Sequence, residues 1–487
     1  CGYSLLYYHH YAGRRMTQAN DSTPGQARAS GPAVADTLAG DRCPAPAPLL
    51  ESRYEFLGDE DIPFSRYTSR AFFEQEIEQL WGRAWQWACR EEHLQDVGDT
   101  WVYNVGPYSV IVMRTESGAI QAYRNSCMHR GTKLKPSFSS GTSFSIRCPY
   151  HGWDWNLDGT LKSFPCEWDF PHVRPEEMAL TPVSLGRWGG FVFINLDPDA
   201  PPLLEYLHPL PEHIDSSVFE NRYVAQHIQK ELNCNWKIAS EAFLEAYHVM
   251  ETHSQLMRTN GDANTQYDFY GDHVSRLINV AGSPSAFLKE SITEQEILDL
   301  FLIGDRDDVA EGLVVPEGGN ARQVMAQHFR DSVGRNGPDL SQVSDSEIVD
   351  SIAYFVFPNQ QFFAGVSFPI VYRFRPLGMQ KDRALFDLIL LKPRPTDGTG
   401  DGARVETALP VWLKADESYT IVPGMDPYVG EVFDQDTGNM QAAHEGALTA
   451  AKSGATLGNY QEVRIRHFHQ TLSKYLASRP TGDRGET

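Results

Sequence analysis

Several features are scarce or missing in this 487-residue sequence. Basic residues are few, since 42 Lys and Arg stand against 64 Asp and Glu and give a formal net charge of −22. Nucleic acid and anionic membranes bind clusters of Lys and Arg, so we expect neither as a partner. No apolar run approaches the roughly 20 residues that span a bilayer. We therefore expect no transmembrane anchor.

Cysteine is also sparse. The seven cysteines are scattered too unevenly for a disulfide framework, which favours a reducing setting, and we expect a soluble cytoplasmic protein. The chain lacks a Gly-rich dinucleotide fingerprint after a predicted strand and a plant-type cysteine cluster. A reductase is therefore not expected. NAD(P)H and flavin should act only through a separate reductase.

Four metal-ligand residues stand in two short motifs eighteen residues apart. The first is Cys127-Met-His129 and the second is Cys148-Pro-Tyr-His151. In a Rieske [2Fe–2S] site, two thiolates bind one iron and two imidazoles bind the other. A glycine closely follows each motif and lets backbone N–H groups approach the cluster sulfides. We predict a Rieske site, with a structural zinc as the alternative, although zinc fingers usually pair Cys with Cys and His with His.

A second group of ligand-type residues lies in a helix predicted from about 236 to 251 and just beyond it. Glu241, Glu245 and His248 are spaced i, i+4 and i+7, so they share one helical face. His253 follows five residues later, about 140° further around an ideal helix. If both histidines bind one metal, the helix should end or distort between them. Two imidazoles and one carboxylate form the facial triad of non-haem Fe(II) oxygenases.

The third ligand of such a triad would be a distant carboxylate. Our candidate is Asp436, at the start of a predicted helix that runs to Leu448, and its nearest competitors are Asp434 and Asp426. Two histidines at this spacing are weak support alone, because short patterns often occur by chance. A Rieske motif in the same chain strengthens the prediction of a mononuclear iron site.

With these residues in view, the chain resembles the catalytic α subunit of Rieske non-haem iron oxygenases. This is the aromatic-ring-hydroxylating dioxygenase family with its monooxygenase and demethylase relatives, and the resemblance runs from about Glu55 to Ser473. It implies an α+β fold, with a Rieske antiparallel β domain and a helix-grip (START-like) catalytic domain of antiparallel sheet and helices. It also implies a homotrimeric ring, while a small β subunit is left undecided.

The resemblance assigns roles to the candidate residues. His248, His253 and Asp436 would bind a mononuclear Fe(II). Glu245 would bridge His248 to the cluster ligand His151 of a neighbouring subunit, so that electrons cross between subunits. Ring-hydroxylating dioxygenases usually have Asp as the bridge, and the Glu here is similar to the branch that includes carnitine monooxygenases.

The implied activity is that of a terminal oxygenase component. Electrons would come from a ferredoxin, a ferredoxin reductase or both, and O₂ would be the co-substrate. The reaction could be mono- or dioxygenation or oxidative demethylation. Apolar residues near the second site, including Phe243 and Phe363, suggest an apolar, aromatic or polycyclic small molecule, although core packing is the commoner role of such residues. The alternative is a Rieske electron-transfer or ligand-sensing protein without oxygenase chemistry.

Composition and periodicity divide the chain into four expected segments. Within the catalytic domain, residues 291–350 have helical periodicity and are interpreted as a helical insert or lid, or as a connection without a role in substrate entry. Residues 1–15 precede the first methionine, Met16, and are expected to be non-native. The segments are a flexible N-terminal arm at 1–48, the Rieske domain with a lead-in helix over 65–89 at 49–199, the catalytic domain at 200–475, and a flexible tail at 476–487.

Overall fold

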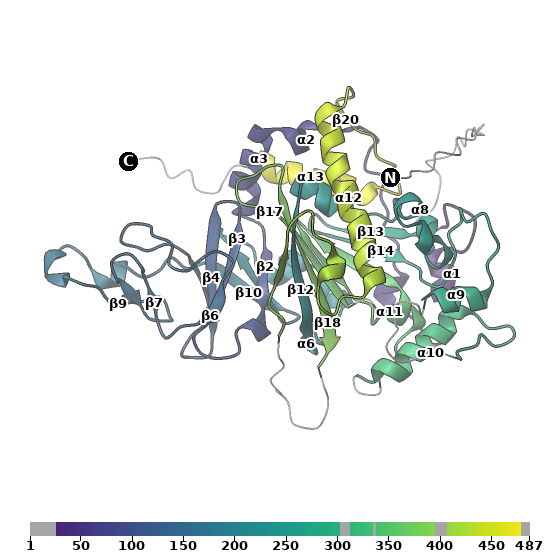
Figure 1. The fold of residues 1–487 in the computed structure, drawn as a ribbon, viewed down its shortest axis with the longest axis horizontal. Helices are drawn as coiled ribbons and strands as arrows, with labels where there is room; N and C mark the ends of the chain where they lie inside the picture. The colour runs from purple at the N-terminus through teal and green to yellow at the C-terminus, as the bar shows by residue number, and fades with distance from the viewer. Residues whose placement is uncertain (1–25, 302–311, 335–337, 368, 395–406, 479–487) are drawn as a thin grey trace.

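The computed structural model describes residues 26–301, 312–334, 338–367, 369–394 and 407–478. These residues form a domain of small antiparallel sheets beside a larger domain built on an eight-stranded sheet (Figure 1). The predicted α+β fold is confirmed. Among the described residues, no helix combines the length and the apolar character that crossing a bilayer requires.

The first domain contains three antiparallel sheets. Gly106 turns the chain between two paired strands with a positive φ of 52°, a conformation that favours glycine. The four-stranded sheet has the order β5 (Ile120–Arg124), β4 (Tyr108–Arg114), β3 (Asp99–Val105), β6 (Ser140–Thr142). The others are β7 (Ile146–Arg147), β8 (Asp154–Trp155), β9 (Leu161–Ser163), and β10 (Ser184–Trp188), β11 (Phe191–Asn195), β2 (Gln86–Arg90).

The large sheet forms the centre of the second domain. Neighbouring strands in this sheet pair antiparallel, except for β12 and β19, which run parallel. The order is β13 (Gln266–Tyr270), β14 (Val274–Asn279), β15 (Ser351–Val356), β16 (Gln360–Phe363), β17 (Ile370–Pro376), β18 (Ala384–Pro393), β12 (Arg222–Leu232), β19 (Val411–Leu413). A separate short pair joins β1 (Ile62–Pro63) to β20 (Gly454–Ala455).

Both faces of this sheet are buried. Successive strand residues point to opposite faces, so Phe355 and Leu388 enter one hydrophobic cluster while Val356 and Ile389 enter another. The first cluster includes residues of α7 (Trp236–Glu241), α12 (Pro427–Thr449) and α13 (Val463–Ala477). Figure 1 shows α12 running across the sheet. The second cluster includes residues of α4 (Leu203–Leu207), α5 (Leu210–His213) and α6 (Ser217–Glu220).

Two predicted helices are broken in the structure. The lead-in helix over 65–89 is α2 (Ser65–Thr68), α3 (Arg70–Glu76) and a π-helical turn, followed by β2. The helix over 236–251 is α7 and α8 (Val249–Thr252). Between them, the Ala246 N–H donates to the Tyr267 hydroxyl and the His248 N–H to the Glu245 carboxylate. Side chains therefore take backbone donors that a continuous helix would use.

A buried charge network joins the two domains. On the large sheet, the Asp387 carboxylate lies 2.9 Å from Arg373 and 3.2 Å from Arg375. The other ends of these guanidinium groups donate to the carbonyl oxygens of Trp87 and Asn104 in the first domain. All three charged side chains are at most 2% exposed. Two arginines and one carboxylate thus fix how the domains sit on each other.

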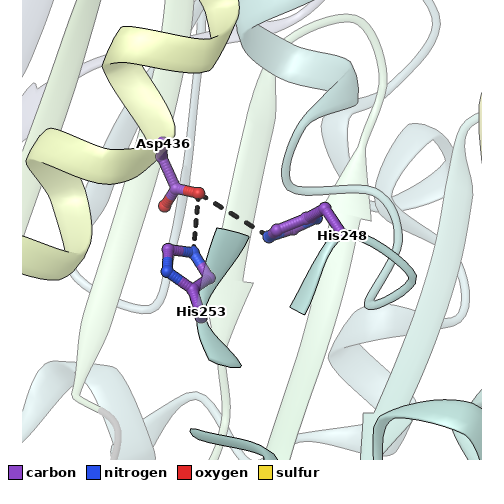
Figure 2. A group of neighbouring side chains, drawn as sticks. All are labelled: His248, His253 and Asp436. Carbon is purple, nitrogen blue, oxygen red and sulfur yellow. Dashed lines mark hydrogen bonds and ion pairs between the residues drawn. The ribbon is translucent and has the colours of Figure 1, made fainter. Parts of the chain in front are cut away.

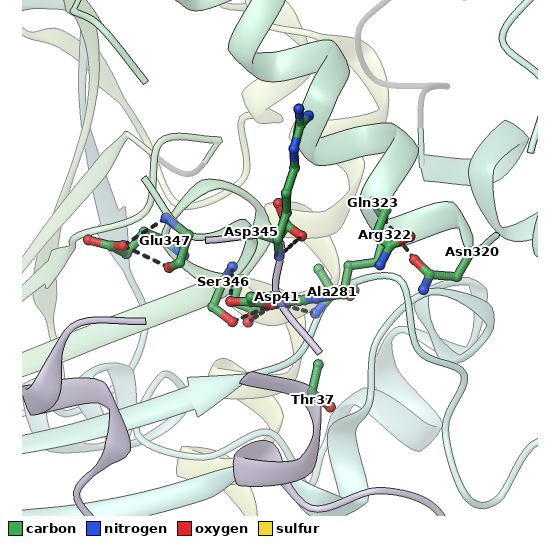
Figure 3. A network of polar contacts seen from close by, with 12 residues as sticks. Thr37, Asp41, Ala281, Asn320, Arg322, Gln323, Asp345, Ser346 and Glu347 are labelled. Atoms are coloured by element: carbon green, nitrogen blue, oxygen red, sulfur yellow. Dashed lines mark hydrogen bonds and ion pairs between the residues drawn. The ribbon is translucent and has the colours of Figure 1, made fainter. Parts of the chain in front are cut away.

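The N-terminal arm departs from its prediction. Residues 26–48 were expected to be flexible, yet they include α1 (Val34–Leu38) and contact the predicted insert (Figure 3). The Asp41 carboxylate lies 3.3 Å from Arg322 and accepts the Ser346 N–H at 2.9 Å. These contacts hold the arm on α10 (Ala321–Gly334) and α11 (Asp345–Val349). The prediction failed because the partners are far away in the sequence. Residues 1–25 and 479–487 lie outside the described residues.

The insert predicted at 291–350 contains three helices within its described residues. Besides α10 and α11 it contains α9 (Glu294–Phe301), and the three helices share a small core with Ile297, Met325 and Ile348. The Ser285 N–H donates to the Met257 carbonyl, which connects the segment before this region to the short 3-10 helix after His253.

Candidate metal centres

The two Rieske motifs occupy loops of the same design. In each loop the cysteine N–H donates at 2.8 Å to the carbonyl five residues later, from Cys127 to Thr132 and from Cys148 to Trp153. In each, the glycine four residues after the cysteine donates its N–H back to the cysteine carbonyl and has a positive φ, of 71° and 76°. Glycine adopts this conformation without a steric penalty. Each sequence motif therefore folds into the same tight turn.

These loops bring like ligands together. Cys127 and Cys148 are buried, and burial, with a further contribution from the Cys148 thiol, raises the pKa of Cys127. The rings of His129 and His151 lie 4.8 Å apart, and Trp153 stacks on His129 with an interplanar angle of 8°. His129 Nδ1 is buried and has no hydrogen-bond partner. Two neighbouring thiols, two neighbouring imidazoles and an unpaired ring nitrogen fit a Rieske cluster.

The second predicted site is a compact triad. The ligand atoms of His248, His253 and Asp436 all lie within 4.8 Å of one another (Figure 2). Asp436 Oδ1 is 2.8 Å from His253 Nε2 and 3.6 Å from His248 Nε2. His253 is the residue at which α8 ends, as expected if both histidines face one metal. Two imidazoles and one carboxylate around one point fit a mononuclear Fe(II).

The structure distinguishes Asp436 from its two competitors. Asp426 caps the N-terminus of α12 by accepting the N–H groups of Tyr428 and Val429. Asp434 accepts from the Tyr419 N–H and lies 3.4 Å from Lys230, away from both histidines. The helix over 436–448 was predicted too short, because α12 begins at Pro427 and Asp436 lies well inside it.

Glu245 lies directly behind His248. Its Oε1 is 2.6 Å from His248 Nδ1, so the proton on that ring nitrogen is directed to the carboxylate and Nε2 faces Asp436. Burial lowers the pKa of His248, but the hydrogen bond and charge of Glu245, together with Asp436, raise it to about 8. Glu245 is 9% exposed, whereas the neighbouring Tyr247 is 50% exposed, so this edge of the site is close to the surface.

Gln435, a polar residue beside the triad, was not identified from the sequence. Gln435 Oε1 lies 2.7 Å from His253 Nδ1, and its position next to Asp436 was the only local signal. Glu241 has a different environment. Its carboxylate accepts from the Tyr67 hydroxyl at 3.0 Å and lies 2.9 Å from His469 Nε2, so it belongs to a buried cluster beside α13 and not to the triad.

The raised pKa of His248 leads to a pH prediction for metal binding. A metal at Nε2 must displace the proton that this ring carries below pH 8. We expect the affinity for Fe(II) to fall about tenfold per unit as the pH drops below 8, and to level off above it. Titration against a competing chelator between pH 6 and 9 measures this. Glu245→Gln lacks the charge that raises the pKa of His248, so the pH below which the affinity falls should be lower in this variant. An unchanged pH would contradict the role given to Glu245.

The fold and these two sites define a two-centre iron protein with a Rieske domain and a helix-grip domain. Family sequence profiles agree: that of the ring hydroxylating alpha subunit (catalytic domain) matches residues 219–478 and that of the Rieske [2Fe-2S] domain matches residues 84–174. The profile of the catalytic domain covers more than half of the chain. This protein therefore belongs to the ring-hydroxylating alpha subunit family, and the predicted Rieske cluster and mononuclear iron agree with its two domains.

Curated relatives fall into two functional groups. The chain is 33% identical over 192 residues to the biphenyl 2,3-dioxygenase subunit alpha of Rhodococcus jostii, which is 38% of this chain and 42% of that protein. It is 30% identical over 209 residues to the carnitine monooxygenase oxygenase subunit of Acinetobacter pittii, 41% of this chain and 55% of that protein. These alignments span about half of each relative's length.

Solved structures show the same fold at low identity. A quaternary ammonium Rieske monooxygenase superposes with a TM-score of 0.60 at 16% identity, covering 85% of this chain and 95% of that one. A naphthalene 1,2-dioxygenase variant bound to phenanthrene gives a TM-score of 0.60 at 18% identity, covering 87% and 94%.

Proposed function

We propose that this chain is the terminal oxygenase component of a Rieske non-haem iron system. It would use O₂ and electrons from a ferredoxin or ferredoxin reductase to hydroxylate or oxidatively demethylate a small molecule. The observation that carries the proposal is the presence, in one chain, of paired Cys and His loops and a separate triad of two histidines and one aspartate. An electron carrier alone has no need for the second site.

Each centre has a defined set of protein groups. Cys127, His129, Cys148 and His151 would hold the cluster, and His248, His253 and Asp436 would hold the iron. When bound, the cluster supplies electrons one at a time and the iron activates O₂. The chain's own contribution is positioning and exclusion of water, since His253 and Asp436 are 3% and 5% exposed.

Glu245 is the proposed bridge between centres of neighbouring subunits in a homotrimer. It already accepts the His248 ring proton, and the half-exposed Tyr247 beside it supports an edge that is open to a neighbouring subunit. The cluster-side histidine, His151, is also incompletely buried. A carboxylate that binds one imidazole within the chain and one from outside would orient both rings.

Aromatic side chains beside the triad support an apolar or aromatic substrate. Tyr372 packs on Phe243 at 4.8 Å and on Phe433 at 6.0 Å, and Phe433 lies one turn before Asp436 on α12. Burial, and to a smaller extent the charge of Asp436, raise the pKa of Tyr372. Such rings would line a hydrophobic pocket.

A quaternary ammonium compound is the second candidate substrate. Aromatic faces attract such cations, and relatives of this chain include the choline monooxygenase of Beta vulgaris and the carnitine monooxygenase subunit. Position 245 is Glu where ring-hydroxylating dioxygenases usually have Asp, which also favours a quaternary ammonium substrate. Analysis of the product after one turnover with a chemically reduced enzyme, O₂ and either naphthalene or carnitine distinguishes the two classes.

The first test of the proposed function is the metal content. Anaerobically purified protein, reconstituted with Fe(II), should contain about three iron and two acid-labile sulfide per chain, two iron in the cluster and one in the triad. A ratio near two iron to two sulfide after reconstitution would favour an electron-transfer or sensing role. Absence of sulfide would indicate zinc in the Cys and His loops.

A further inference from the structure

The two histidines of the triad have chemically different partners. His248 Nδ1 faces the carboxylate of Glu245 at 2.6 Å, whereas His253 Nδ1 faces the neutral amide of Gln435 at 2.7 Å. An imidazole that binds a metal through one nitrogen carries its proton on the other, and the acceptor of that proton fixes the ring orientation. His253 obtains this acceptor from α12 and not from its own loop.

Helix α12 contacts both nitrogens of the same ring. Asp436 Oδ1 lies 2.8 Å from His253 Nε2, and Gln435, the preceding residue, contacts Nδ1. Successive residues of a helix point about 100° apart, so their side chains can reach around a ring placed between them. One turn of helix therefore sets both the ligand carboxylate and the orientation of the histidine that shares its metal.

A second donor orients the Gln435 amide. Gln255 Nε2 donates to the same Oε1 at 2.9 Å, so two N–H groups converge on that oxygen. An amide with its NH₂ group turned to the ring would repel a protonated Nδ1. Gln255 lies two residues after His253, in a short 3-10 helix that thus holds the amide oxygen toward the ring.

We propose that Gln435 is a positioning residue for the iron site, which holds the proton of His253 on Nδ1 and leaves Nε2 free for the metal. Gln255 assists by orienting the amide. This inference rests on the proposed function, because it assumes that the triad binds a metal. It assigns a role in metal affinity to a glutamine that lies exposed on the surface of α12.

The test compares three substitutions in the cluster-loaded protein. Gln435→Leu has a similar size but no acceptor, and we expect its Fe(II) dissociation constant, measured by chelator competition, to rise roughly 10- to 100-fold. Gln435→Glu keeps an acceptor oxygen and should stay within about threefold of wild type. Gln441→Leu changes an exposed glutamine on the same helix and should have no effect. The visible cluster spectrum and thermal midpoint report on folding, and Gln435→Ala repeats the test if Leu disturbs it.

The outcomes separate this inference from the function on which it rests. Weakened binding in Gln435→Leu together with retained binding in Gln435→Glu supports the positioning role. Wild-type affinity in Gln435→Leu, or equal losses in the Leu and Glu variants, overturns it while leaving the iron site intact. If Asp436→Ala binds as much Fe(II) as the wild-type protein, the triad is not a metal site. Both the inference and the proposed function are then wrong.

Discussion

Asp436→Ala is expected to lose the mononuclear iron and all product formation while keeping the [2Fe–2S] cluster. Asp436 supplies the only carboxylate among the described residues that lies within reach of both histidines. Two imidazoles alone hold Fe(II) weakly. Iron should fall from about three to about two per chain with sulfide unchanged at about two. Metal and sulfide assays, with the visible spectrum of the cluster, measure both centres in one sample.

The matched control for this substitution is Asp434→Ala. Asp434 lies on the same helix but contacts Lys230, Ser418 and the Tyr419 N–H, so its loss should leave iron content unchanged. It should instead destabilise the protein by about 1–3 kcal/mol, because buried donors lose their acceptor. Iron loss in Asp434→Ala with normal iron in Asp436→Ala would show that the wrong carboxylate was chosen.

The candidate metal sites could be proposed from the sequence because most of their residues are local. The Cys and His pairs lie within two short loops, and His248 and His253 lie within six residues of each other. The distant candidate ligand Asp436 was chosen from residue type and position, and the structure shows it beside both histidines. Gln435 was missed because a contact between a glutamine and a histidine 182 residues away leaves no pattern in either segment.

Parts of the fold could not be predicted, also because of long-range contacts. The longest strand, β12, was not identified because its buried face carries the polar residues His227 and Gln229. Both contact Asp387 on the adjacent strand β18, at 3.0 and 2.6 Å. A strand whose inward side chains are polar shows no apolar alternation, so only the partner strand explains its burial.

Glu245→Gln is expected to reduce turnover by at least about 100-fold while both centres stay occupied. The amide can still accept the His248 ring proton, so the iron ligands keep their places. What is lost is the charge that would orient a cluster imidazole of the neighbouring subunit. The measurement is a single turnover, in which the chemically reduced protein is mixed with substrate and O₂ and the reoxidation of the cluster is followed by absorbance.

Two variants make this result specific to the proposed bridge. Glu241→Gln changes a carboxylate four residues earlier in the chain that contacts Tyr67 and His469, and it should leave cluster reoxidation unchanged. Glu245→Asp keeps the charge on a shorter side chain and should retain more activity than the amide. Normal product formation in Glu245→Gln, with one product formed per two electrons, would remove Glu245 from the electron path. Its contact with His248 would then serve only to orient the iron ligand.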